Sequence, residues 1–138
     1  MVAVLFINTL FAQSYEQARS NKSAEVNVYY YENEPYVYKD KSGKLVGIEI
    51  DILNSFVSWL KAEKGIELEL EYVPFKKFDV FYQQVVAASP NTIGLGSVTI
   101  TESRSKEVKF SAPYLKNVAV LVTDGSVPTA RNEEDLKS

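Results

Sequence analysis

Residues 51–72, DILNSFVSWLKAEKGIELELEY, place a helical pattern directly before a strand pattern and so decide the fold class. Apolar side chains recur every three or four residues over 51–64, which is the period of an amphipathic helix. Asp51 suits the N-cap of this helix, and Gly65 suits the left-handed residue that ends it. Over residues 66–72 apolar side chains alternate with glutamates, which predicts a strand with one solvated face.

The chain on both sides of this segment continues to change between strand and helix. Residues 26–31 are rich in β-branched and aromatic side chains, and an extended run over 45–50 follows a turn that contains Gly43. The other predicted elements are helices over residues 78–88 and 102–107 and strands over 92–99 and 118–122. This alternation predicts an α/β fold with a mostly parallel sheet and flanking helices.

The composition excludes several classes of function. The chain has 138 residues, the usual size of one domain, and a net charge of −3 without a basic face, which weighs against nucleic acid as a partner. It has no cysteine and no histidine, so it can form neither a disulfide nor a Ser-His-Asp triad. We expect no metal and no organic cofactor.

The first residues resemble an export signal. Residues 1–12, MVAVLFINTLFA, are apolar and are followed by small or polar residues, which is typical of the core and cleavage region of a signal peptide, although the basic start is missing. Residues 13–24 are polar and without periodicity, which predicts a flexible arm. The alternative is a buried N-terminal strand.

A small-residue loop and an arginine form a candidate anion site. Residues 94–99, GLGSVT, follow a predicted strand but match neither a dinucleotide fingerprint nor a Walker loop. Free N–H groups and two hydroxyls there suit a carboxylate, and Arg104 could reach back with its two-pronged guanidinium. The alternatives are glycines kept for close packing and a surface arginine paired with Glu102 or Glu107.

Aromatic residues gather near the predicted strand ends. They could pack against the apolar part of a small ligand or lie over an ammonium group, and the alternative is that they are ordinary core. These residues are Tyr29, Tyr30, Tyr31, Tyr36, Tyr38 and Phe78. Glu32 and Glu34 could bind an amino group or could be solvated loop charges.

Three ordered blocks resemble extracytoplasmic solute-binding proteins of the polar amino-acid ABC-transporter type, which have a two-lobed type II periplasmic-binding fold. The blocks are PYVYKDKSGKLVGIEIDIL at 35–53, GSVTITESR at 96–104 and VKFSAPY at 108–114. The resemblance implies an export-dependent protein in the periplasm or otherwise outside the cytoplasm. It also implies a membrane permease as partner, a monomeric state, and capture of a small amino acid without bond chemistry.

The resemblance also implies roles for particular residues. Arg104 would clamp the ligand α-carboxylate with help from Thr99, Ser97 would accept from the α-amino group, and Phe78 would stack on the ligand side chain. Tyr30 and Asn33 fall at further ligand positions but depart from the family's pattern. Tyr30 replaces an acidic residue that is common where the ligand is basic, and Asn33 replaces an aromatic residue before the proline.

The resemblance covers one lobe. It implies a solute-binding lobe over residues 25–123 and the hinge or the start of a second lobe over 124–138, so we expect the chain to be a fragment. The same module also occurs as the sensing domain of membrane-bound histidine kinases, as the regulatory part of lytic transglycosylases, and as a small periplasmic dehydratase. These alternatives stay open at this point.

Overall fold

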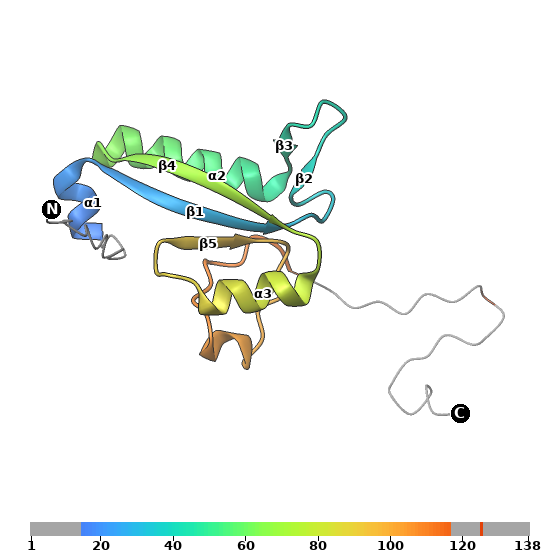
Figure 1. Cartoon of the computed structure of the whole chain (residues 1–138). Helices are drawn as coiled ribbons and strands as arrows, with labels where there is room; N and C mark the ends of the chain where they lie inside the picture. Colours follow the sequence, from blue (N-terminus) through green and yellow to red (C-terminus); the bar gives the residue numbers. More distant parts are fainter. Residues whose placement is uncertain (1–14, 117–124, 126–138) are drawn as a thin grey trace, which may run out of the picture.

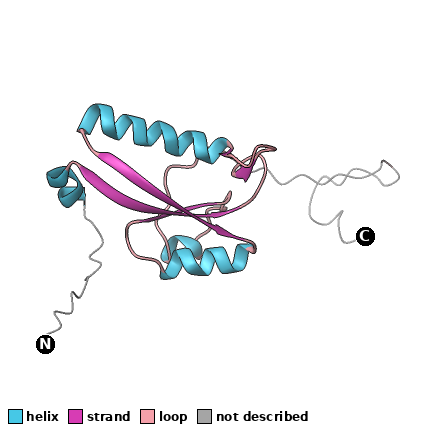
Figure 2. Ribbon diagram, turned by 45° about the horizontal axis from the view of Figure 1, so that its top comes forward, coloured by secondary structure: helices cyan, strands magenta, loops and turns pink. Residues whose placement is uncertain are grey.

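Three parallel strands form the centre of the computed structural model, which describes residues 15–116 and 125. The strand order is β4–β1–β5, so β1 is central and has neighbours on both sides. Helix α2 covers one face of the sheet and helix α3 covers the other (Figures 1 and 2). The bounds are β1 Ser23–Tyr31, β4 Glu67–Phe75, β5 Thr92–Leu95, α2 Ile48–Trp59 and α3 Phe78–Ala87. The α/β prediction is confirmed.

The two faces of β1 bury different side chains because alternate residues of a strand point to opposite sides. Val28 and Tyr30 face α2, where they pack with Ile50 and Leu53 of that helix. On the other face, rings of β1 and β4 meet rings of α3, as in the pairs Tyr31–Phe78 and Phe75–Phe81. Phe81 of α3 is fully buried.

Helix α2 begins earlier than the sequence predicted. Its N-cap is Gly47, and Asp51 lies in the first turn, so the extended run over 45–50 is reduced to β3 (Leu45–Val46). The N–H groups of Ile48 and Glu49 donate to the backbone carbonyls of Pro35 and Tyr36 at 3.1 and 2.9 Å. These carbonyls satisfy donors that a helix start leaves open, so no side-chain cap is needed.

The end of the same helix is as predicted, with one local change. After Trp59 the helix continues as a π-helical segment η1 (Leu60–Lys64), and Gly65 then takes the left-handed backbone that ends it, with φ 65°. Strand β4 runs on through Pro74 to Phe75, whereas the sequence predicted that Pro74 would end it. Proline is tolerated there because β4 is an edge strand.

Two short segments differ from the prediction. Strand β5 ends at Leu95, four residues before the predicted end, and residues 102–107 hold a short 3₁₀ helix η2 (Arg104–Lys106). β5 is short because it pairs with β1 only along the four partners that start at Asn27. The predicted strand over 118–122 lies outside the described residues.

The predicted arm over residues 13–24 needs correction where it is described. Helix α1 (Tyr15–Asn21) lies there, and β1 already begins at Ser23. Ala18 of the helix is buried against Ala24 and Ile66, and this small apolar contact explains why the polar segment is ordered. The predicted signal over residues 1–12 and hinge over 124–138 fall outside the description, apart from Gly125.

A hairpin connects β1 to α2. It pairs β2 (Tyr38–Lys39) with β3 in antiparallel register. Asp40 holds the turn, since its Oδ1 accepts from the N–H and hydroxyl of Ser42 and from the N–H of Lys44 at 2.8, 2.6 and 3.0 Å.

Among residues 15–116, no helix has the length and apolar character that crossing a bilayer requires.

Candidate functional site

The carboxyl ends of the three parallel strands meet at one edge of the sheet, where open α/β sheets bind their ligands. β1 ends at Tyr31 and β5 ends at Leu95, while β4 leads into Phe78 at the start of α3. Residues 96–104, here called the 96–104 loop, follow β5 at this edge. The loop contains three of the residues to which the sequence assigned ligand contacts, Ser97, Thr99 and Arg104.

Arg104 lies over aromatic rings of α3. Its Cζ is 5.3 Å from the ring centre of Phe78 and 5.2 Å from that of Tyr82, distances typical of cation–π contact. The two rings are neighbours one helical turn apart and are nearly parallel, at 13°. Nη1 donates to the backbone carbonyl of Thr99 at 3.1 Å. These contacts fix the guanidinium while leaving its other N–H groups without a protein acceptor among the described residues.

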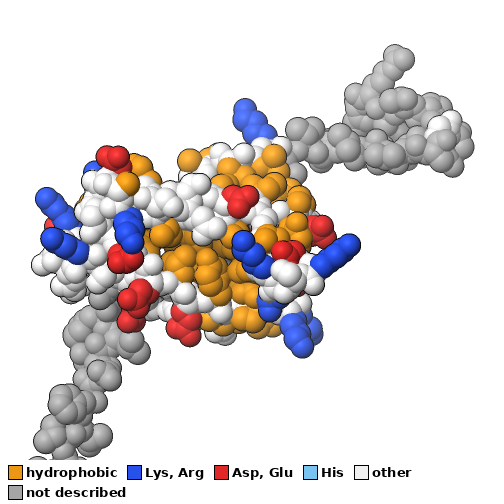
Figure 3. Space-filling model, turned by 90° about the horizontal axis from the view of Figure 1, so that it is seen from above, with side chains coloured by type: hydrophobic (Ala, Val, Ile, Leu, Met, Phe, Trp, Pro, Cys, Tyr) orange, Lys and Arg blue, Asp and Glu red, His pale blue; other side chains and the backbone are white. Residues whose placement is uncertain are grey.

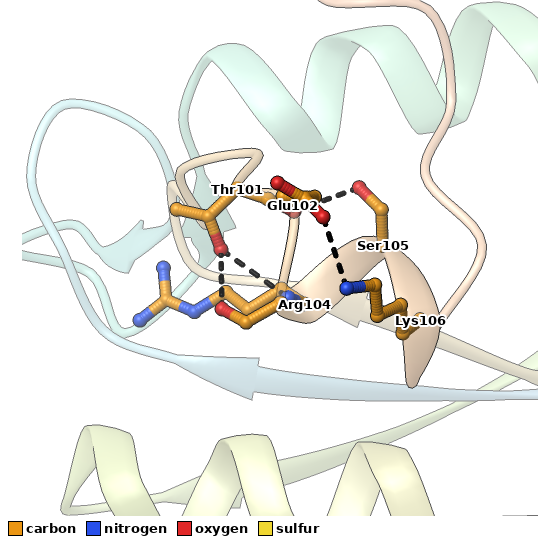
Figure 4. A network of polar contacts seen from close by, with 6 residues as sticks. Thr101, Glu102, Arg104, Ser105 and Lys106 are labelled. Carbon is orange, nitrogen blue, oxygen red and sulfur yellow. Dashed lines mark hydrogen bonds and ion pairs between the residues drawn. The ribbon is translucent and has the colours of Figure 1, made fainter.

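The acidic neighbours of Arg104 have other partners. Glu102 pairs with Lys106 at 2.9 Å, and Glu107 accepts from the hydroxyl of Tyr82 at 2.8 Å. Figure 4 shows the guanidinium of Arg104 pointing away from the Glu102–Lys106 pair. The alternative of a surface arginine paired with Glu102 or Glu107 is therefore not what the structure contains.

The polar network at the start of η2 sets the direction of the Arg104 side chain. The hydroxyl of Thr101 accepts from the backbone N–H of Arg104 at 3.2 Å, and its carbonyl accepts from the Ser105 hydroxyl at 2.8 Å (Figure 4). The Thr101 side chain thus closes the turn that leads into η2, whose N-cap Ser103 makes no side-chain capping bond.

Ser97 has an unusual backbone conformation. Its φ is 55°, in the left-handed region that non-glycine residues seldom adopt. Its N–H donates to Oε1 of Glu49 at 2.9 Å, so the loop is tied to the first turn of α2. Its side chain is half-buried.

The glycines before Ser97 serve close packing. A Cβ at Gly94 would lie 2.9 Å from Cγ2 of Val85, and one at Gly96 would lie 3.3 Å from both Cε1 of Phe81 and Cβ of Tyr31. Side chains at these positions would push the 96–104 loop away from α3. The close-packing alternative therefore holds, and it places the loop within reach of the aromatic rings.

The sequence reasoning assigned no role to Glu49 and Tyr114. Glu49 is only 7% exposed, and its Oε1 accepts from the hydroxyl of Tyr114 at 2.7 Å as well as from Ser97. Burial, and then the hydrogen bond to Glu49, raise the pKa of Tyr114. Both residues stand inside the motif blocks, but only contacts across the fold reveal that they meet.

Tyr30 lies in the core, whereas Asn33 is half-buried in the turn after β1 and its expected ligand contact stays a prediction. Tyr30 is 3% exposed within the core beneath α2, so the alternative of an ordinary core residue describes it and the expected ligand contact is corrected. Asn33 shapes a turn, since its N–H donates to the carbonyl of Val37 at 2.8 Å. The tyrosine that faces the predicted site is Tyr31, whose ring meets that of Phe78 edge to face with 5.9 Å between the ring centres.

An apolar hollow lies elsewhere. It has a volume of about 320 Å³ and is lined mainly by apolar side chains near the amino ends of the strands, at the edge opposite to Arg104. Its lining includes Tyr15 of α1, Phe56 of α2 and Ile66 before β4. The described residues contain no cluster of three acidic side chains that could hold a metal ion.

Comparison with known proteins gives a consistent family. Residues 26–138 match the family described as bacterial extracellular solute-binding proteins, family 3. A protein of Haemophilus influenzae named "Probable amino-acid ABC transporter-binding protein" is 27% identical over 75% of this chain and 37% of its own. An L-cystine-binding protein of Escherichia coli is 28% identical over 75% of this chain and 36% of its own. The chain thus spans just over a third of the length of these relatives.

Solved structures agree with this match. An ancestral arginine-binding protein bound to arginine is 29% identical, with a TM-score of 0.51, over 66% of this chain and 37% of that one. An ancestral cyclohexadienyl dehydratase is 25% identical, with a TM-score of 0.53, over 76% of this chain and 40% of that one. The described fold thus corresponds to about two fifths of each solved protein, as expected for one lobe.

Proposed function

The chain belongs to the bacterial extracellular solute-binding proteins of family 3, and from this membership we propose that it binds the carboxylate of a free amino acid at the 96–104 loop. Arg104 is the principal contact, and the N–H and hydroxyl of Thr99 add to the grip. Ser97 accepts from the α-amino group, and Phe78 packs against the ligand side chain. No bond is made or broken.

The observation that carries this proposal is the state of the Arg104 guanidinium. It packs against two rings, donates one hydrogen bond to Thr99, and is not neutralised by either nearby glutamate. A guanidinium held in place with donors still available matches the two oxygens of a carboxylate. The position at the carboxyl edge of a parallel sheet supports the same reading.

In the whole protein, this lobe would form one wall of a cleft and a second lobe the other. Closure of two lobes around the ligand excludes water and adds contacts, so the lobe alone should bind weakly. The proposed partner is the membrane permease of an ABC importer, which one relative's name supports. The proposed location is the periplasm or another extracytoplasmic space, in keeping with the family's description.

The likeness to an ancestral dehydratase favours one alternative, an acid–base enzyme on the same fold. Such an enzyme needs a proton donor or acceptor that faces the ligand. The two glutamates close to Arg104 in the sequence already have partners, Glu102 with Lys106 and Glu107 with Tyr82. We therefore retain binding as the proposed role.

Binding is tested by titrating the chain with millimolar L-arginine, L-glutamine, L-lysine and L-cystine, each followed separately by the rise in melting temperature. Ligands that bind the native state raise its stability by mass action. We expect at least one of the four to raise it, and Arg104→Ala to abolish the effect. Arg19→Ala, at an exposed arginine of α1, is the matched control and should leave it unchanged. An equal rise in Arg104→Ala would refute the carboxylate clamp.

A further inference from the structure

We propose that Glu49 is the positioning residue of the ligand site: its buried carboxylate holds the 96–104 loop in the form that presents Arg104, and ties this loop to the segment around Tyr114. The inference deepens the proposed function, on which it rests. Glu49 is not expected to touch the ligand, because the residue is only 7% exposed and its Oε2 is buried. It acts through the backbone of Ser97.

The first step is the strained loop residue. Ser97 has a φ of 55°, and a left-handed backbone costs a non-glycine residue on the order of 1–2 kcal/mol unless its surroundings hold it. The hydrogen bond from its N–H to Oε1 of Glu49, at 2.9 Å, is the contact that holds it. Bonds to a charged acceptor are among the stronger ones.

The second step carries the constraint to Arg104. Two residues after Ser97, the carbonyl of Thr99 accepts from Nη1 of Arg104 at 3.1 Å. The direction of that carbonyl depends on the backbone that Ser97 begins. If Ser97 relaxes out of the left-handed region, Thr99 rotates and the guanidinium loses its one protein acceptor in the described part of the chain.

The third step brings in Tyr114. Its ring is 46% exposed, yet its hydroxyl reaches the buried Oε1 of Glu49 at 2.7 Å. The segment that carries Tyr114 comes after η2 and runs along the molecule toward the end of the described residues. One carboxylate oxygen thus joins three segments that are far apart in the sequence: the start of α2, the 96–104 loop and the Tyr114 segment.

The fourth step is that stability alone does not account for a carboxylate here. Oε2 of Glu49 is buried and has no hydrogen-bond partner among the described residues. A buried, partly satisfied carboxylate is costly, and an apolar residue of similar size would often serve the fold as well or better. The position in the first turn of α2 offsets part of this cost through the helix dipole. What the carboxylate adds is Oε1, which accepts the two hydrogen bonds from Ser97 and Tyr114.

The test compares Glu49→Ala, Glu49→Gln and Tyr114→Phe with the wild-type chain. Controls are Glu71→Ala, at an exposed glutamate of β4, and Tyr72→Phe, whose hydroxyl has no hydrogen bond in the described residues. Amide hydrogen exchange, read by NMR without ligand, is compared at Ser97 and at Val28 in the core. Exchange at Val28 reports a general loss of stability. The ratio of the exchange rate at Ser97 to that at Val28 therefore isolates the local change at Ser97.

We expect Glu49→Ala to raise exchange at Ser97, relative to Val28, at least about tenfold, as loss of a bond to a charged group predicts. Glu49→Gln keeps an acceptor oxygen and should restore much of the protection. Tyr114→Phe should leave Ser97 protected within about twofold, because the bond from its N–H to Glu49 remains. Unchanged relative exchange in Glu49→Ala, or failure of Glu49→Gln to restore it, overturns the proposal.

A ligand titration then separates the two proposals. With the amino acid that stabilises the wild type most, Glu49→Ala should weaken binding at least about fivefold, and Glu71→Ala should not. Equal affinity of Glu49→Ala and wild type overturns the positioning role even if exchange changes. If none of the four amino acids binds the wild type, the proposed function fails, while exchange at Ser97 still decides whether Glu49 holds the loop. If Glu49→Ala does not fold, Glu49→Met, which has a similar size but no acceptor oxygen, takes its place with the same expected rise in exchange at Ser97.

Discussion

At the scale of single residues, the site depends on how Arg104 is held. Tyr82 and Phe78 present their ring faces to its guanidinium, and Glu107 accepts from the Tyr82 hydroxyl. Burial, and then the bond to Glu107, raise the pKa of Tyr82, so its hydroxyl stays protonated at neutral pH. The ring and the hydroxyl of Tyr82 therefore make separable contributions.

Tyr82→Leu should weaken amino-acid binding about threefold to tenfold, because it removes one of the two rings under Arg104. Tyr82→Phe is the matched control, since it keeps the ring and removes only the bond to Glu107, and its affinity should stay within about twofold of the wild type. The measurement is an NMR titration with L-arginine or L-glutamine. Equal weakening in both variants would show that the ring does not matter.

Residue types and motif spacing indicated which segments gather at this edge of the sheet better than they indicated the contacts among them. Phe78 and the block that contains Ser97, Thr99 and Arg104 come together at one edge of the sheet. Tyr30 was misplaced, because three consecutive tyrosines gave no sign of which one faces the core. The alternation of β1 decides it, and it turns Tyr31 toward Phe78. Contacts such as Glu49 with Ser97, 48 positions apart, leave no trace in local pattern.

At the scale of secondary-structure elements, the start of α2 shows how backbone geometry controls the site. Gly47, its N-cap, has a φ of 126°, and a Cβ there would lie within contact of the Tyr36 carbonyl. The helix that follows carries Glu49. The sequence predicted this helix from its apolar period and missed its first turn, because the donors there are satisfied by backbone carbonyls and not by a recognisable cap.

Gly47→Ala should destabilise the chain by about 2–4 kcal/mol, from the positive φ and the clash with Tyr36 together. Gly43→Ala is the control, since Gly43 also has a positive φ, of 83°, but a Cβ there meets nothing within 4 Å. It should cost about 1–2 kcal/mol. Urea denaturation followed by circular dichroism gives both values. If the two variants were equally stable, the close approach to Tyr36 would be of no consequence.

The β2–β3 hairpin gives a pH dependence. Bonds from Ser42, and then from the Lys44 N–H, lower the pKa of Asp40. A lowered native pKa means that the contribution is present above the unfolded value and is lost as pH falls through the native value. The amides of Ser42 and Lys44 should therefore shift in NMR spectra only as pH falls below the ordinary aspartate range, and not in Asp40→Asn. A midpoint at or above the ordinary value would contradict this.

At the scale of the whole molecule, the described fold is one lobe with an apolar face. Large apolar side chains of α2 lie exposed at successive turns, and hydrophobic atoms gather over the middle of the face in Figure 3. The exposed apolar residues of α2 are Ile48, Ile52, Phe56 and Trp59. The alternation of strand and helix, together with the three motif blocks, was enough to predict this lobe, and the family comparison confirms it.

Phe56→Lys should lower the fluorescence of an apolar dye bound to the chain, since Phe56 is 44% exposed and stacks on Trp59. The helix should keep its stability, because the exposed ring contributes little to the core. Val80→Lys, at a 42% exposed residue of α3, is the control for a general change of charge. Equal dye binding in Phe56→Lys and wild type would show that this face is not the apolar surface that the dye detects.

The most direct test of the central claim is a map of amide shifts in the NMR spectrum of the chain as L-arginine and L-glutamine are added. The account predicts that the perturbed amides cluster at Ser97, Thr99, Arg104 and Phe78, and that Arg104→Ala removes these shifts. Perturbations confined to the apolar hollow near Tyr15 and Ile66, or a map that persists unchanged in Arg104→Ala, would contradict it.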